Sequence, residues 1–261
     1  MKRLSPMIAL AVMAMAPPLA AQDISGVFDM GLLTGDAAMD PVIEQSREMA
    51  IRQGEADPLP DRARATAHPL AGNLAQNFSA TTEPVPAAAL GQLTYRPSPA
   101  VREANFARFV ERSRAADPQG AEKLAQALRS TDVMAAAERE MAPMGLSTSN
   151  VADASAVYLG NAWLLLNGET DDPPAPVMQA LRDQLARAMI ATPEFAAADD
   201  ATKQELAEAM IIHAILIAQY TEMARANPDM LPAVQDAVAA GVRGTLGLEL
   251  RGKTLDERGL R

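Results

Sequence analysis

The stretch VADASAVYLGNAWLLLNG, residues 151–168, decides the fold of this protein. Asn150 precedes it as a helix cap, and Gly168 stands where helices commonly end in a left-handed residue. Apolar residues cover two neighbouring helix faces, Val151, Ala154, Tyr158, Ala162 and Leu165 on one and Leu159, Trp163 and Leu166 on the next. A helix that is apolar nearly all round is buried. We therefore expect the central helix of a bundle here, with Trp163, the only tryptophan, filling its core.

The one acid of this helix has a local explanation. Asp153 lies at the third helical position, where a carboxylate accepts amide hydrogens and faces the positive helix end. The alternative is a cofactor box or a sugar-stacking platform around Trp163. The helix offers no second carboxylate, histidine or cysteine to support chemistry. We therefore favour the structural interpretation and expect any function to lie elsewhere.

Outward from this helix, a short polar residue followed by proline marks four further helix starts: Ser98-Pro99, Asp117-Pro118, Thr192-Pro193 and Asn227-Pro228. The polar side chain caps the helix, and proline fits the first helical position. Apolar stripes at helical spacing follow: Val101, Phe106, Phe109 and Val110; Ala121, Leu124, Ala125 and Leu128; Val133, Met134, Ala137 and Met141; Met178, Leu181, Leu185, Ala188 and Met189; and Leu231, Val234, Val238 and Val242. We also predict helices over 174–191 and 200–226, which gives an all-α, single multi-helix domain over 98–250.

The residues before this domain have a different composition. Lys2 and Arg3, an apolar run over 7–15 and small residues ending at Ala21 predict a signal peptide over 1–21, the alternative being a buried N-terminal helix. Residues 22–97 are proline-rich, and we expect a largely disordered linker there with one short amphipathic helix near 41–53. That helix either docks on the core or recruits a partner.

The C-terminal end carries a different pattern. Residues 245–251, TLGLELR, alternate in period two, which allows a short extended segment. We expect the charged residues 251–261 to be frayed.

Composition excludes several classes of function. The 33 acidic against 23 basic residues give a net charge of −10, which argues against nucleic acid and anionic lipid as partners. The chain has no cysteine, so thiol chemistry and thiolate metal sites are absent. No second long apolar segment follows the signal peptide, so we expect no stable membrane insertion after cleavage and a periplasmic or secreted protein. We expect no cofactor, and the oligomeric state is open.

His213 is the best single candidate for reactivity. It lies on one face of the predicted long helix with Tyr220, between apolar positions, and a histidine there is either a general base, a metal ligand or a buried neutral ring. No carboxylate stands three or four residues away, and the other histidine, His68, falls in the linker. We favour the buried neutral ring.

Two charged groups have alternative interpretations. Glu205 and Glu208 are either a carboxylate pair or part of a helix start, with Thr202 and Glu205 spaced as a capping box, which we favour. Four arginines give one predicted helix a basic character: Arg102, Arg108, Arg112 and Arg114. They form either a partner or phosphate patch or, as we favour, a solvated face paired with Glu103 and Glu111.

The segments LTYRPSPAVREANFARFVERSRAADPQGAEKL (93–124), VADASAVYLGNAW (151–163) and ATPEFAAADDATKQELAEAM (191–210) resemble an exported bacterial family known as domain of unknown function 6683. The resemblance covers about 93–250 and implies a helical domain behind a signal peptide in a Gram-negative host. It implies no reaction and no catalytic residues. We therefore predict a non-enzymatic interaction or structural module of the cell envelope, partnered by another envelope protein. The alternative is a small-molecule-binding protein or hydrolase-like enzyme around His213 and Tyr220.

Overall fold

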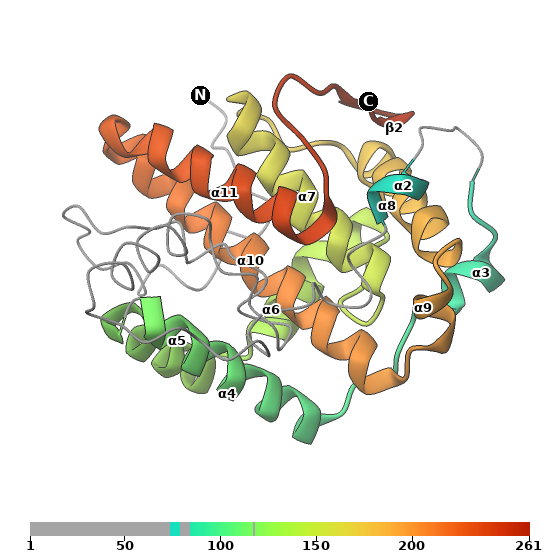
Figure 1. Ribbon diagram of the computed structural model, residues 1–261, viewed down its shortest axis with the longest axis horizontal. Coiled ribbons are helices and arrows are strands. Elements are labelled where there is room, and N and C mark those ends of the chain that lie inside the picture. Colours follow the sequence, from blue (N-terminus) through green and yellow to red (C-terminus); the bar gives the residue numbers. More distant parts are fainter. Residues whose placement is uncertain (1–73, 79–83, 117) are drawn as a thin grey trace, which may run out of the picture.

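The structure is a computed structural model that describes residues 74–78, 84–116 and 118–261 (Figure 1). Its elements are α2 (Leu74–Asn77), α3 (Ala87–Gly91), α4 (Pro99–Ala116), α5 (Pro118–Ser130), α6 (Val133–Met141), η4 (Ala142–Met144), α7 (Val151–Asn167), α8 (Ala175–Ile190), α9 (Pro193–Ala197), α10 (Asp200–Ala226), η5 (Pro228–Met230), α11 (Leu231–Leu246), β1 (Leu255–Asp256) and β2 (Gly259–Leu260). The all-α fold class is confirmed. The expected signal peptide and the helix near 41–53 lie outside the described residues.

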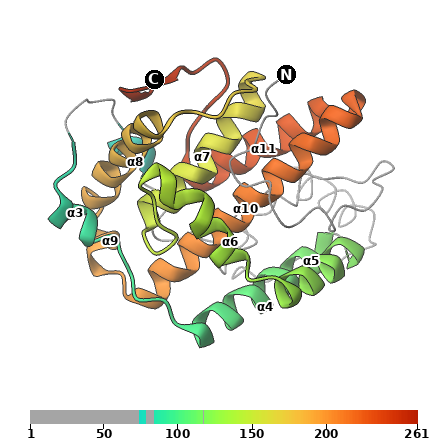
Figure 2. The ribbon, with the colours of Figure 1, turned by 180° about the vertical axis from the view of Figure 1, so that it is seen from behind.

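Helix α7 lies at the centre, packed against α10, α8 and α11 (Figures 1 and 2). Every residue from Val151 to Ala162 is buried. Asn150 caps the helix by accepting the amide hydrogens of Ala152 and Asp153 at 2.9 and 3.3 Å, and Gly168 ends it at a φ of 68°. The prediction of a central helix with these ends is confirmed.

Trp163 departs from its predicted place. Its ring is only partly buried, and its Nε1 donates to the carbonyl oxygen of Lys253 at 2.8 Å. An indole carries a polar N–H that needs a partner, and the backbone of the C-terminal segment supplies one. The prediction that Trp163 fills the core is therefore wrong, because the ring lies at the edge of the core and holds the chain end.

The apolar stripes face inward as predicted along α6 and α8. All four stripe residues of α6 and all five of α8 are buried. In α11 the three valines are buried, but Leu231 is 37% exposed because it is the first residue of the helix. The prediction that Leu231 faces inward is therefore wrong, whereas the other three residues of that stripe are buried as predicted.

The predicted helix starts hold, but the expected side-chain caps at Thr192 and Asn227 are wrong, and Asp117 lies outside the described residues. Ser98 accepts the amide hydrogen of Val101 at 3.4 Å at the start of α4. Thr192 and Asn227 instead donate to carbonyl oxygens four residues earlier, in the helix that each one follows. The preceding helix ends within one or two residues of each side chain, so its unpaired carbonyls are the nearer partners.

The start of α10 also differs in its cap. Asp199 accepts the amide hydrogen of Thr202 at 2.8 Å, so Asp199 is the cap and the predicted capping box from Thr202 to Glu205 is wrong. The helix already begins at Asp200, which places Thr202 inside the first turn. The bounds predicted for this helix, 200–226, are confirmed.

The core begins before residue 98, where we expected it to start. Leu74 of α2 packs on α8 and is fully buried, and Leu93 and Tyr95 are 1% and 4% exposed. Thr94 pairs with Asn150 in an isolated β-bridge, which ties this segment to the start of α7. The described residues ahead of 98 are therefore part of the helical unit.

The expected fraying of 251–261 is wrong. Here β1 and β2 form an antiparallel hairpin whose Leu255 and Leu260 are buried against the domain. The side-chain amide of Gln184 donates to the Leu260 carbonyl at 3.0 Å and accepts its amide hydrogen at 2.8 Å. The Gln184 side chain thus forms the two hydrogen bonds that a neighbouring strand would form. The local sequence does not predict this contact, because the two residues are far apart in the chain.

Candidate functional site

A groove runs along one side of the α4–α5 hairpin and encloses about 770 Å³. Its floor is apolar: Phe106, Val110, Ala125, Leu128 and Val133. Its rim is charged: Arg102, Glu103, Glu111, Arg114, Arg129 and Asp132. Figure 1 shows the hairpin at one border of the molecule, on the side opposite the C-terminal hairpin.

The groove divides the apolar stripe that the sequence indicates for α4. Phe109 points into the core and is 4% exposed, whereas Phe106 lines the groove and is only partly buried. Leu128 of α5 is partly buried in the same way. The prediction of core-facing stripes therefore holds for the five buried residues Phe109, Val110, Ala121, Leu124 and Ala125, and is wrong for Val101, Phe106 and Leu128, which are only partly buried. No residue-spacing signal separates the two faces, because both follow helical periodicity.

The rim arginines are engaged by acids of the same chain. Arg114 pairs with Glu111, as predicted, and also lies 3.7 Å from a carboxylate oxygen of Glu122. Arg129 pairs with Glu122 at 3.4 Å. The interpretation as a solvated, internally paired face is thus supported for these residues. The side chain of Arg112 is outside the described part.

The pairing expected between Arg102 and Glu103 is replaced by a longer-range one. Arg102 Nε lies 2.8 Å from Glu208, whose side chain is 1% exposed. Asn105 and Gln204 also donate to this carboxylate, at 2.8 and 2.9 Å. All four groups are polar and meet between α4 and α10. The network therefore satisfies a buried charge and fixes how α4 lies on α10.

Glu205 and Glu208 do not act as a carboxylate pair. Glu205 lies 3.1 Å from Arg108 near the surface, while Glu208 is held by the buried network. Each carboxylate therefore has its own cation. The sequence did not predict which arginine pairs with which glutamate. The pairs join α4 and α10, which lie about a hundred residues apart in the chain and meet only in the folded protein.

His213 and Tyr220 lie inside the bundle. His213 is 1% exposed, its Nδ1 lies 3.0 Å from the Ala209 carbonyl, and its ring contacts those of Phe109 and Tyr158 edge-on. Burial lowers the pKa of His213 to about 4, so the ring is neutral at pH 7. Tyr220 is 8% exposed. A substrate would reach either ring only if the surrounding helices separated.

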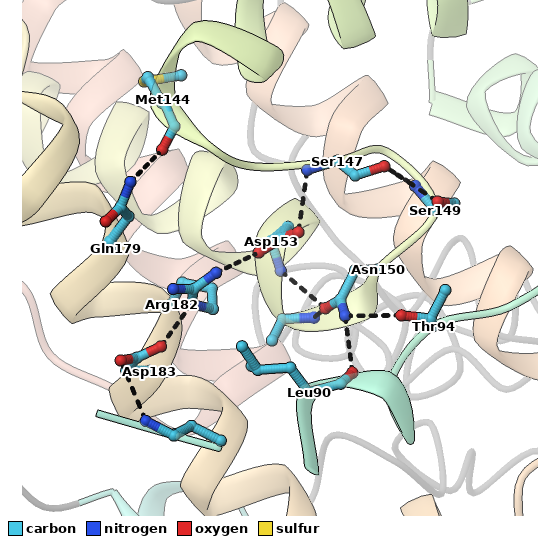
Figure 3. A network of polar contacts seen from close by, with 12 residues as sticks. Leu90, Thr94, Met144, Ser147, Ser149, Asn150, Asp153, Gln179, Arg182 and Asp183 are labelled. Atoms are coloured by element: carbon cyan, nitrogen blue, oxygen red, sulfur yellow. Dashed lines mark hydrogen bonds and ion pairs between the residues drawn. The ribbon is translucent and has the colours of Figure 1, made fainter. Parts of the chain in front are cut away.

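A second polar cluster surrounds the start of α7 (Figure 3). Asp153 accepts the amide hydrogen of Ser147 at 2.9 Å, and its other oxygen lies 3.6 Å from Arg182 of α8. Arg182 Nε in turn lies 2.5 Å from Asp183. On the far side of the loop, Glu138 accepts from Thr148 through its amide at 2.7 Å and its hydroxyl at 2.6 Å. These acids fix the loop over residues 145–150.

The cluster changes the role predicted for Asp153. We expected its carboxylate to accept amide hydrogens of its own helix start, but Asn150 does so, and Asp153 binds the preceding loop instead. Burial raises the pKa of Asp153 to about 6, against the lowering effect of the Ser147 amide and Arg182. The Asp153 carboxylate is buried and out of reach of a ligand. We therefore interpret the cluster as structural.

Neither a metal site nor a membrane-spanning helix is found within residues 74–78, 84–116 and 118–261. No three His, Asp or Glu side chains in these ranges are grouped so that they could hold a metal ion together. Every helix in the same ranges is too short or too polar to form a membrane span.

The fold and the groove together define an all-α, helical-bundle protein with an open, apolar-floored surface on α4 and α5. The chain belongs to a family of unknown function, DUF6683, whose sequence profile matches residues 8–261. This range is wider than the 93–250 over which the resemblance was recognised. No curated protein and no solved structure matches the chain.

Proposed function

We propose that this protein is a non-enzymatic interaction module that binds an amphipathic helix of another protein in the α4–α5 groove. The groove itself is the observation that carries the proposal, because the partly buried Phe106 and Leu128 lie together in it, beside further apolar residues and under a charged rim. Single apolar residues on a surface are ordinary, whereas a contiguous patch with a polar rim is typical of a binding site.

The shape of the groove favours a helix over a compact ligand. The lining residues of α4 recur every three or four positions from Pro99 to Arg114. At 1.5 Å per residue this stripe is about 22 Å long, the length of a helix of about 15 residues. In helix-in-groove recognition a partner helix lays apolar anchors, three or four residues apart, into such an elongated groove.

The N-terminal pattern supports an exported protein, with the partner in the cell envelope or outside the cell. Lys2, Arg3 and the apolar run up to Ala21 support this location. N-terminal sequencing of the protein from an envelope fraction is expected to begin at Gln22, and a start at Met1 would contradict export with cleavage.

The groove is tested by filling it from an exposed position. Ala107 lines the groove on α4, and Ala104 is exposed on the same helix without lining it. We expect Ala107→Gln to weaken binding of a 15-residue leucine-striped helical peptide by about tenfold, because a polar side chain then occupies apolar space. The matched variant Ala104→Gln should bind like the natural chain. Equal binding by all three proteins, or no binding by any, would refute the proposal.

A further inference from the structure

Resting on the proposed function, we infer that the groove selects helices with basic side chains at the end where Glu103 and Asp132 lie. The inference concerns the chemistry of the partner, which the apolar floor alone does not specify. It follows from which rim charges are already neutralised within the chain and which are not.

Both acids lie at one end of the groove. Helices α4 and α5 are joined at residue 117 and pack side by side along their length (Figures 1 and 2). Residues at similar distances along the chain from this joint therefore lie near one another. Glu103 stands in the second turn of α4 and Asp132 is the second residue after α5, so both lie toward the open end of the hairpin. Both side chains line the groove and both residues are exposed.

The basic side chains of the rim are occupied. Arg102 is held by the buried Glu208. Arg114 and Arg129 are matched by Glu111 and Glu122, so these four charges cancel.

The two acids at the end of the groove differ from these arginines. Within the described ranges, no ion pair involves Glu103 or Asp132. Asp132 does accept the amide hydrogen of Ala135 at 2.9 Å as the cap of α6, but this contact leaves its negative charge in place. Two uncompensated carboxylates thus stand beside an apolar floor.

Such an end attracts a cation and repels an anion. A partner helix that places lysine or arginine beside Glu103 and Asp132 gains two ion pairs at the edge of an apolar contact, whereas acidic residues there meet like charges. Because the pairs are on the rim, their effect is modest and falls with added salt. The groove is therefore suited to a basic amphipathic helix.

The test uses two 15-residue helical peptides with the same leucine stripe, one with lysines and one with glutamates on the polar face. Their dissociation constants are measured against the full chain at low and high salt. We expect the lysine peptide to bind about tenfold more tightly at low salt and the difference to shrink at high salt. The double variant Glu103→Gln, Asp132→Asn should lose most of this preference, and asparagine preserves the cap of α6.

A matched control separates the groove from the overall negative charge of the chain. The double variant Asp171→Asn, Glu257→Gln makes the same change in net charge at exposed residues outside the groove lining. It should keep the full preference for lysine. If both peptides bind equally, or the control loses the preference as well, the inference is overturned while helix binding stands. If neither peptide binds, the proposed function fails. A peptide of residues 41–53 that outcompetes the lysine peptide would make the chain's own segment the occupant and overturn the inference.

Discussion

The α4–α5 hairpin and the α7–α8 pair are both two neighbouring helices with apolar stripes, yet they bury those stripes differently. In α7 and α8 the stripes are sealed by α10, α11 and the C-terminal hairpin. In this hairpin α4 contacts α10 with one face and α5 with another, while Phe106 and Leu128 remain partly open along the groove. One pair is the core of the domain, and the other is half core and half surface.

The charged residues follow the same division. Around α7 the acids Asp153 and Glu138 fix a loop, and their partners are backbone amides, hydroxyls and Arg182. Around α4, Arg114 and Arg129 pair with acids at the surface and Arg102 pairs with the buried Glu208, whereas Glu103 and Asp132 have no ion pair among the described residues. A buried polar group needs a hydrogen-bond or ion-pair partner within the fold, whereas an exposed group can form these contacts with another protein. This difference separates the structural cluster from the candidate site.

The largest expected effect compares one leucine from each pair. Leu185 of α8 is fully buried, and Leu128 of α5 is partly buried at the groove. We expect Leu185→Ala to lower the free energy of unfolding by about 4 kcal/mol and Leu128→Ala by about 1 kcal/mol, because only the first leaves an enclosed cavity. Urea denaturation of both variants measures the two values. Similar losses would show that the groove residues belong to the core.

The next effect concerns the ion pairs. Arg102→Met leaves the buried Glu208 without its cation, and we expect a loss of roughly 3 kcal/mol in the free energy of unfolding. The control, Arg129→Met, removes a side chain that is 67% exposed and should cost roughly 1 kcal/mol or less. The same urea titration reads both. A small effect at Arg102 would mean that Asn105 and Gln204 alone satisfy the carboxylate.

The smallest effect is a pH dependence at Asp153, whose carboxylate faces Arg182 of α8 and senses Glu138 of α6. Its pKa is about 6 in the fold and about 3.9 in an unfolded chain, so the folded state binds the proton more tightly. The stabilisation is therefore complete below the lower value and lost as the pH rises through 6.

We expect Asp153→Asn to gain stability relative to the natural chain between pH 5 and pH 7.5, by roughly 1 kcal/mol. Urea midpoints at several pH values give the difference. The exposed Asp171→Asn serves as the control and should show no such trend. A constant offset for Asp153→Asn across this range would contradict the raised pKa.

Most of the fold could be predicted because the signals that define a helix lie within the helix and the residues next to it. Caps such as Asn150, the glycine at 168 and apolar residues every three or four positions gave α7, α8 and α10 nearly to the residue. The errors lie at the ends of elements. Thr192 was expected to cap the next helix and Trp163 to fill the core, but their hydrogen bonds go to neighbours that the local sequence does not specify.

Less of the candidate site could be predicted. The arginines of α4 were recognised as a basic group, and the pair with Glu111 was expected because it is three residues away. The pair from Arg102 to Glu208 was not, because the two residues meet only when α4 packs on α10. The groove was not expected at all, since Phe106 and Phe109 have the same chemistry and differ only in what lies opposite.

By itself, the sequence determined the class of the fold, the order and bounds of the main helices and the acidic, cysteine-free character of the chain. These are properties of neighbouring residues, set by capping, helix propensity and periodicity. Only the tertiary structure decided that α7 is sealed, that Glu208 receives Arg102, that Gln184 pairs with the C-terminal hairpin and that α4 and α5 leave a groove. These depend on which apolar faces find a partner, and burial is a relation between segments far apart in the chain.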